Sequence, residues 1–352
     1  MIFDDLCLYL RLYPEILNLR FAREMIYYLL KGVSRHPISI NFLITSKCNF
    51  KCKICSYYGN SGTHFSELSF QEFVDFLDQV QAFKPLIFLG GGEPFIREDI
   101  YSMLEEIEKR ELKVIVSTNG YLLDLDRISS LNLDSLILSL YGPESIHDSI
   151  TGVPGSYSVV VKKIKKITAD NMVKNLVVST ILLPSNFKHL SEFSDSVFAL
   201  GVDSIKIENL NYLTEEEFGS STEEMADLIL KPHTLVLDKH CFSRTDLEYA
   251  WNSINVLRRR YKGRLFLKPA LNKRDFLKWY CEGKTFKGCH FIRHSIFVSS
   301  SGDIIPCQFL SKTKLGKIDK NVVKYIWNSK RYNDFREFVQ RTGLEVCKRC
   351  CK

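Results

Sequence analysis

The stretch ISINFLITSKCNFKCKIC, residues 38–55, predicts the fold and the chemistry of the chain that follows it. Residues 38–44 are mostly apolar and typical of a buried strand, and they lead into Cys48, Cys52 and Cys55. Three thiolates within eight residues can bind one face of a 4Fe–4S cluster but leave its fourth iron without a protein ligand. A zinc ion would favour a fourth Cys or His nearby, which is not evident here. The stretch therefore predicts a cluster with one iron open to a small molecule, in preference to three unrelated structural cysteines.

Strand-like and helical segments alternate regularly after this loop. The further strand-like runs are residues 86–89, 114–116, 136–140, 176–182 and 204–208. The helical runs are residues 69–80, which open with a capping box, 97–110, 156–169 and 187–200. Apolar strands joined by helices indicate a parallel sheet, and right-handed crossovers curl such a sheet into a barrel. The predicted fold class is α/β: a partial (β/α)6 TIM-like barrel with a small C-terminal cysteine-rich β-hairpin and helix domain.

Glycines and polar residues follow these strands at the edge of the barrel where chemistry takes place. The segment GGEP, residues 91–94, follows the second strand, STNG at 117–120 follows the third, and SLYG at 139–142 follows the fourth. Glycines let the backbone approach a ligand closely, and Glu93 offers an anionic acceptor for an ammonium group. We expect these segments to meet the cysteine loop.

The C-x3-C-x2-C loop and the GGEP segment together resemble the radical S-adenosylmethionine superfamily over about residues 38–210. The resemblance implies that the open iron chelates the amino and carboxylate groups of S-adenosylmethionine, while Cys48, Cys52 and Cys55 hold the other irons. It also implies that the GGEP segment hydrogen-bonds the methionine amino group and that Ser139 contacts the ribose or the carboxylate. The residues that the resemblance assigns to S-adenosylmethionine are Gly91, Gly92, Glu93, Pro94, Asn119 and Ser139.

Four cysteines near the C-terminus form a second predicted site. Cys289 and Cys307 flank a predicted β-hairpin with its turn at residues 301–303, and Cys347 and Cys350 form a C-x2-C motif. By ligand count these four thiolates fit a 4Fe–4S cluster or a zinc ion equally well. The arrangement resembles the SPASM and twitch domains of the same superfamily, which implies an auxiliary 4Fe–4S cluster.

The sequence stops at Lys352, before the further cysteines of a full SPASM domain, so we expect one auxiliary cluster. A zinc-stabilised tail is the alternative. Cys281 and Cys351 are additional thiols, either of which can substitute as a ligand. The predicted parts are an N-terminal helical segment, the barrel, a mostly helical bridge and the auxiliary cluster domain, at residues 1–37, 38–211, 212–280 and 281–352.

Composition and charge exclude several other classes. The 352 residues are 45% hydrophobic and 25% charged, so the chain is neither disordered nor collagen-like. The net charge of +7 is spread along the sequence, so we expect no nucleic-acid partner. No apolar stretch reaches the roughly 18 residues of a membrane span, and Asp4 and Asp5 stand where an export signal would be basic. Eleven cysteines, an odd number, argue against a disulfide framework, and we expect a cytoplasmic protein.

The resemblance implies an enzyme that cleaves S-adenosylmethionine reductively to a 5′-deoxyadenosyl radical, which abstracts a hydrogen atom from a substrate. The auxiliary cluster would transfer electrons or bind substrate, and a flavodoxin or ferredoxin would supply electrons. Only 37 residues precede the first strand, too few for an added leader-recognition domain, so we favour a small-molecule substrate over a peptide. The alternative class is a non-catalytic iron–sulfur or zinc-binding protein.

No catalytic acid or base is identifiable from the sequence. Tyr141 stands where many members of the family have Asp, and Glu208, Asn209, His290 and His294 are further candidates to line the cavity. For the N-terminal helix we favour packing on the body of the protein over contact with a membrane surface.

Overall fold

The computed structural model describes residues 19–55, 67–219, 235–238, 241–283, 288–319 and 322–350. Asp4, Asp5, Cys351 and the first 18 residues of the predicted N-terminal segment lie outside the described residues. Among the helices within those ranges, none has the length and hydropathy needed to cross a bilayer.

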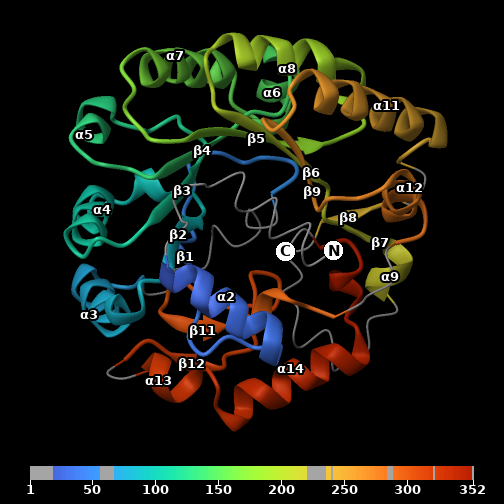
Figure 1. Cartoon of the computed structure of the whole chain (residues 1–352). Coiled ribbons are helices and arrows are strands. Elements are labelled where there is room, and N and C mark those ends of the chain that lie inside the picture. The colour runs from blue at the N-terminus through green and yellow to red at the C-terminus, as the bar shows by residue number, and fades with distance from the viewer. Residues whose placement is uncertain are drawn as a thin grey trace.

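Parallel strands stand side by side in chain order and curve into an open barrel with helices on the outside (Figure 1). The strands expected from the sequence are β1 (Ser39–Thr45), β2 (Leu86–Gly91), β3 (Val114–Thr118), β4 (Ser135–Ser139), β5 (Leu176–Leu182) and β6 (Ser204–Asn209). The covering helices are α3 (Phe70–Val80), α4 (Ile100–Lys109), α5 (Leu125–Ser129), α6 (Glu144–Thr151), α7 (Ser156–Ala169) and α8 (Leu190–Ala199). Each strand pairs in parallel with the next. The predicted α/β partial barrel is confirmed.

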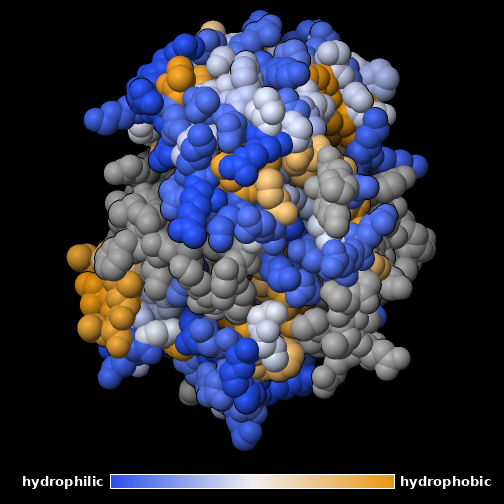
Figure 2. Space-filling view, turned by 90° about the vertical axis from the view of Figure 1, so that its right-hand side faces the viewer, coloured by the Kyte–Doolittle hydropathy of each residue, from blue (hydrophilic) through white to orange (hydrophobic). Residues whose placement is uncertain are grey.

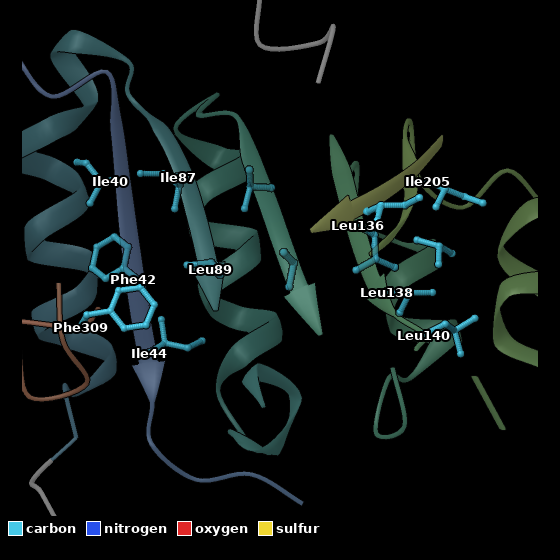
Figure 3. Close-up of a cluster of buried hydrophobic side chains, with 14 of the residues drawn as sticks. Ile40, Phe42, Ile44, Ile87, Leu89, Leu136, Leu138, Leu140, Ile205 and Phe309 are labelled. Atoms are coloured by element: carbon cyan, nitrogen blue, oxygen red, sulfur yellow. The ribbon is translucent and has the colours of Figure 1, made fainter. Parts of the chain in front are cut away.

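Two apolar layers explain why these strands are apolar runs. Ile40, Phe42 and Leu138, drawn in Figure 3, belong to the large core between the sheet and its covering helices. Ile115 and Val177 belong to a second core inside the barrel. Because both faces of the sheet are covered, neither face has to be polar along the whole length of a strand.

Helix α3 begins at the capping box that the sequence predicts. The hydroxyl of Ser69 accepts a hydrogen bond from the N–H of Glu72 at 3.2 Å, and the carboxylate of Glu72 accepts one from the N–H of Ser69 at 2.9 Å. These bonds satisfy N–H groups that the first helical turn leaves without partners.

Helix α2 (Leu19–Lys31) closes the end of the barrel at which the strands begin. Phe21 and Tyr28 are buried in the inner core, whereas Leu19 and Leu30 are exposed. The expected packing of the N-terminal helix on the body of the protein is confirmed for its described part. Among the coloured residues on the face drawn in Figure 2, hydrophilic ones predominate.

The C-terminal hairpin extends the sheet of the barrel. Strands β10 (Ser295–Val298) and β11 (Asp303–Ile305) pair antiparallel, which confirms the predicted hairpin, although the reversal at residues 299–302 begins before the predicted turn. Strand β10 also pairs in parallel with β1, so that Ser39 lies opposite Ser295. The cysteine-rich part is therefore joined directly to the barrel wall.

The segment interpreted as a mostly helical bridge contributes a strand that the sequence did not predict. Strand β9 (Leu265–Lys268) pairs in parallel with β6. The sequence did not indicate this strand because so short an apolar run fits a strand as well as a helix. The other described elements are β7 (Leu213–Thr214), α9 (Glu215–Gly219), β8 (Val236–Leu237), α11 (Arg244–Arg260), α12 (Lys273–Cys281), β12 (Gly316–Lys317), α13 (Val322–Ile326) and α14 (Lys330–Thr342). The main sheet has the order β12-β11-β10-β1-β2-β3-β4-β5-β6-β9.

Candidate functional site

The cysteine loop leaves β1 at the carboxyl end of the strand. Cys48 is exposed and its sulfur accepts a backbone N–H at 3.4 Å. Cys52 and Cys55 are half-buried, and the N–H of Cys55 donates to the carbonyl of Cys52 at 3.1 Å. The N–H of Lys53 donates to the carbonyl of Ile150 at 2.9 Å, which ties the loop to helix α6. The three predicted ligands thus lie on one loop, which is held to helix α6 at Lys53.

Burial and mutual proximity raise the pKa of these thiols. Partial desolvation of its sulfur raises the pKa of Cys48 to about 11, although the residue as a whole is exposed, and the nearby Glu93 and Cys55 act in the same direction. Burial raises the pKa of Cys52 to about 12, and Cys55 and Cys48 add to that shift. The three sulfurs therefore lie within electrostatic reach of one another. A positively charged metal centre among them would stabilise the thiolates instead.

The glycine bend after β2 lies against the start of this loop. Gly91 has a φ of 119°, and the N–H of Gly92 donates to the carbonyl of Thr45 at 2.8 Å. The N–H of Glu93 donates to the carbonyl of Lys47 at 2.9 Å. A Cβ atom at Gly92 would collide with the carbonyl oxygen of Lys47, so this close approach requires glycine.

Glu93 connects the ends of β2 and β3. Its carboxylate accepts hydrogen bonds from the Thr118 hydroxyl at 2.6 Å, the Asn119 N–H at 2.8 Å and the Phe95 N–H at 3.1 Å, and the residue is 1% exposed. Burial raises the pKa of Glu93, against the effect of these bonds. The Asn119 side chain donates to Asn49 Oδ1 at 2.8 Å and so reaches the cysteine loop. The structure thus brings the GGEP segment, with Pro94 beginning a short 3-10 turn, and Asn119 to the cysteines.

Ser139 and Tyr141 lie at the carboxyl end of β4. The Ser139 hydroxyl acts on the pKa of the Tyr141 phenol, and Cys52, Cys55 and Glu208 are titratable neighbours of that phenol. Burial raises the pKa of Tyr141 far above its ordinary value, and Cys52 adds to the shift. The Tyr141 phenol is therefore within electrostatic reach of both the cysteine loop and Glu208 of β6.

A row of polar side chains crosses the inner face of the barrel beside Tyr141. Ser139 lies opposite Ser179 on β5, and Ser179 lies opposite Lys206 on β6. The Lys206 ammonium is 2.5 Å from Glu208 Oε1, which also accepts a bond from the Ser179 hydroxyl at 3.4 Å. Lys206 is 6% exposed. Sequence reasoning missed Lys206 and Ser179, although the alternation of SIKIEN would have placed Lys206 opposite the apolar face.

The other cavity candidates make hydrogen bonds of their own away from this row. Asn209, His290 and His294 bond to Tyr280, Tyr28 and Ser295 at 3.1, 3.1 and 2.7 Å, respectively. The sequence did not indicate these hydrogen-bond partners of Asn209, His290 and His294.

The second set of thiols lines one apolar cavity. Cys289, Cys307, Cys347 and Cys350 are joined there by side chains that include Phe291, Ile292, Phe309, Leu310, Phe335, Val339 and Val346. Burial raises the pKa of Cys289 to about 11 and raises the pKa of Cys307 and Cys347 further, and the other thiols of the set add to each shift. Four mutually close thiols with apolar walls are a donor set that fits a 4Fe–4S cluster.

Cys281 stands apart from this cavity. It lies exposed at the end of α12, and the charged groups that act on its pKa are Arg244 and Glu282. In the part of the chain that the structure describes, no three His, Cys, Asp or Glu side chains are grouped as a site for a single metal ion. Cys289, Cys307, Cys347 and Cys350 are the candidate auxiliary ligands because they line one cavity, of which Cys281 is not a part.

Comparisons with known families match both parts of the chain. Residues 42–197 match the radical SAM superfamily, and residues 289–351 match SPASM, described as an iron–sulfur cluster-binding domain. The second description supports a cluster over the zinc alternative for the tail. Members of the superfamily are enzymes, so the expectation of a catalyst is confirmed over a non-catalytic binding protein.

Two curated relatives match over most of their length. A tungsten-containing aldehyde ferredoxin oxidoreductase cofactor-modifying protein of Pyrococcus furiosus is 24% identical over 87% of this chain and 85% of the relative. An AdoMet-dependent heme synthase of Methanosarcina barkeri is 24% identical over 91% of each chain. The crystal structure of Streptococcus suis SuiB bound to S-adenosylmethionine covers 93% of this chain and 75% of its own, with a TM-score of 0.66 and 15% identity, which supports the fold. The chain therefore belongs to the radical S-adenosylmethionine superfamily, uses a 4Fe–4S cluster and S-adenosylmethionine, and carries a C-terminal SPASM domain that binds auxiliary iron–sulfur.

Proposed function

We propose that this enzyme abstracts a hydrogen atom from a small molecule held inside the barrel, beside the loop of residues 48–55. The observation that carries the proposal is the convergence of this loop, the GGEP bend and the polar row of β4, β5 and β6 at one end of the barrel. Relatives that match over most of their length are named for a cofactor and for heme, which supports a small molecule as the substrate class.

The binding roles fall to residues at the ends of β1 to β4. Cys48, Cys52 and Cys55 would hold three irons of the first cluster. Gly91, Gly92, Glu93, Pro94, Asn119 and Ser139 would bind S-adenosylmethionine. When bound, the cluster and S-adenosylmethionine supply reductive cleavage of a carbon–sulfur bond and the abstraction of hydrogen. Gly92 allows the backbone to approach, and Glu93 holds the ends of β2 and β3 together.

The inner face of β6 would orient the substrate. Lys206 and Glu208 offer a donor and an acceptor side by side, and Ser179 and Tyr141 add hydroxyl groups next to them. The large apolar core covers the outer face of the same strands and keeps water away from that side of the sheet. Exclusion of water strengthens the polar contacts that these strands make inside the barrel. These residues position a substrate, and none is assigned as a general acid or base.

The auxiliary site would be formed by Cys289, Cys307, Cys347 and Cys350, holding one 4Fe–4S cluster for electron transfer or substrate binding. The pairing of β10 with β1 supports this role, because it joins that site to the same sheet as the first cluster. We further propose a flavodoxin or ferredoxin as the reductant and the reducing cytoplasm as the location, where thiols remain available as ligands.

A peptide substrate is the second candidate. PqqA peptide cyclase of Granulibacter bethesdensis is 23% identical over 77% of this chain and 67% of the relative, and mycofactocin maturase MftC of Mycobacterium tuberculosis is 25% identical over 54% of this chain. These relatives support a peptide-modifying maturase, which differs from the first candidate only in the substrate.

Anaerobic turnover tests the reaction. The protein is reconstituted with iron and sulfide, given S-adenosylmethionine and dithionite, and assayed for 5′-deoxyadenosine. We expect formation in the wild type and background in Cys52→Ala. Equal amounts from both proteins, or none from cluster-loaded wild type, would contradict the proposal.

A further inference from the structure

Arg349 lies inside the C-terminal C-x2-C motif but makes its contacts with another part of the chain. It is 2% exposed, between Cys347 and Cys350 in sequence. Its Nε donates to the carbonyl of Trp279 at 2.7 Å, and its Nη1 forms an ion pair with Glu217. We call Arg349, Glu217, Tyr212 and Trp279 the Arg349 clamp, because the guanidinium also stacks on the Tyr212 ring at 4.4 Å from its centroid.

The partners of Arg349 are fixed to the end of β6. Tyr212 lies in the short segment between β6 and β7, and Glu217 lies in α9. The Trp279 indole donates to the carbonyl of Leu210 at 2.9 Å. The Tyr212 hydroxyl donates to the carbonyl of Tyr280 at 2.8 Å, so α12 is held to the same segment. Contacts therefore run from the end of β6 to Arg349 in the C-x2-C motif.

The charge of Arg349 is matched inside the clamp. Burial alone would raise the pKa of Glu217, but hydrogen bonds from the N–H of Thr214 and from Arg349 lower it below its ordinary value. Glu217 is thus a carboxylate held in place by two donors. Loss of either charged partner would leave the other buried without compensation, which is strongly destabilising for such pairs.

The neighbouring Lys348 provides a contrast within the same motif. Its ammonium pairs with Glu345, one turn away in sequence, and its side chain is 35% exposed. Lys348 therefore makes a local contact, whereas Arg349 bridges positions more than a hundred residues apart. The two adjacent basic residues have different structural roles.

We propose that Arg349 is a positioning residue of the auxiliary site, which holds Cys347 and Cys350 against the end of β6 and so fixes their separation from Cys289 and Cys307. The proposal rests on the assignment of these four cysteines as auxiliary ligands. Residues outside the ligand set that orient ligands commonly control metal affinity, and their loss typically weakens it by about 10- to 100-fold.

The test uses full-length protein carrying Cys52→Ala, so that the iron retained reports the auxiliary site. After anaerobic reconstitution, we measure iron per chain, the EPR spectrum of the reduced cluster and the loss of iron to a chelator. We expect about four irons in this parent protein. Arg349→Met and Glu217→Gln should each lose iron to the chelator roughly 10-fold or more faster and broaden the EPR signal. Lys348→Met, the matched control, should behave as the parent does.

The outcomes separate the two claims. A parent protein without iron would contradict the auxiliary ligand assignment itself. An iron-loaded parent whose retention and EPR spectrum are unchanged by both Arg349→Met and Glu217→Gln would overturn the role of Arg349. Arg349→Lys, which keeps the charge but lacks the planar fork, should fall between the parent and Arg349→Met. Circular dichroism of each variant checks folding, and Glu217→Gln tests the clamp from outside the cysteine motif.

Discussion

The two sets of thiols are built in opposite ways. Cys48, Cys52 and Cys55 come from one loop of eight residues and are exposed or half-buried. The auxiliary set comes from three separate segments and lines a cavity with apolar walls. The first set can lose a ligand while the barrel core stays intact. The second is part of the packing of the C-terminal region, so its ligands and its fold depend on each other.

The largest expected effect separates activity from stability. Cys52→Ala should reduce 5′-deoxyadenosine formation to background but change the free energy of unfolding of the iron-free protein by less than about 1 kcal/mol, because the Cys52 side chain is only half-buried. Cys307→Ala should lower the melting temperature of the iron-loaded protein by roughly 5–10 °C, since a tightly bound ligand of the folded state is lost. Equal melting temperatures of the two variants would contradict the expected difference in stability between the two sites.

Iron removal sharpens the same comparison. Chelation should lower the melting temperature of wild type and of Cys52→Ala by similar amounts, because the auxiliary ligands come from three segments that a bound cluster would join, whereas the first three ligands come from one loop. It should have little effect on Cys307→Ala. Differential scanning calorimetry before and after chelation measures this, and a large chelator effect in Cys307→Ala would contradict it.

The glycine bend gives the next effect. Gly92→Ala should cost about 1–3 kcal/mol and abolish 5′-deoxyadenosine formation, because the added Cβ meets the Lys47 carbonyl that holds the cysteine loop. Gly155→Ala is the matched control: its φ is 78°, but an added Cβ has no neighbour within 4 Å. It should cost roughly 1–2 kcal/mol from backbone strain alone and retain activity. Urea unfolding and the turnover assay distinguish the two.

The smallest effect is a dependence on pH. Burial lowers the pKa of His147 and of His294 to about 4 from 6.5; Asp148 opposes the shift at His147, and His290 adds to it at His294. Both imidazoles therefore stay neutral in the folded state where the unfolded chain would take up protons. Their contribution to stability is complete above about pH 6.5 and declines as the pH falls towards 4. Unfolding of iron-free protein between pH 7 and 5 should show this decline, and His147→Gln and His294→Gln should each make it shallower.

Local patterns predict the part of the molecule that local forces determine. The six barrel strands, the capping box at Ser69 and the place of the GGEP segment follow from periodicity and short-range hydrogen bonds. The pairing of β10 with β1 and of β9 with β6 joins segments far apart in sequence, so no local pattern reveals it. The same limit applies to Arg349, which resembles Lys348 until its contact with Glu217 is known.

EPR spectroscopy tests the central claim most directly, that the cysteine loop and the glycine bend together bind S-adenosylmethionine at an open iron. Reduced wild type and reduced Cys52→Ala are compared before and after addition of S-adenosylmethionine. We expect a changed spectrum in wild type and an unchanged one in Cys52→Ala, where only the auxiliary cluster remains. No change in wild type, or the same change in both proteins, would contradict it.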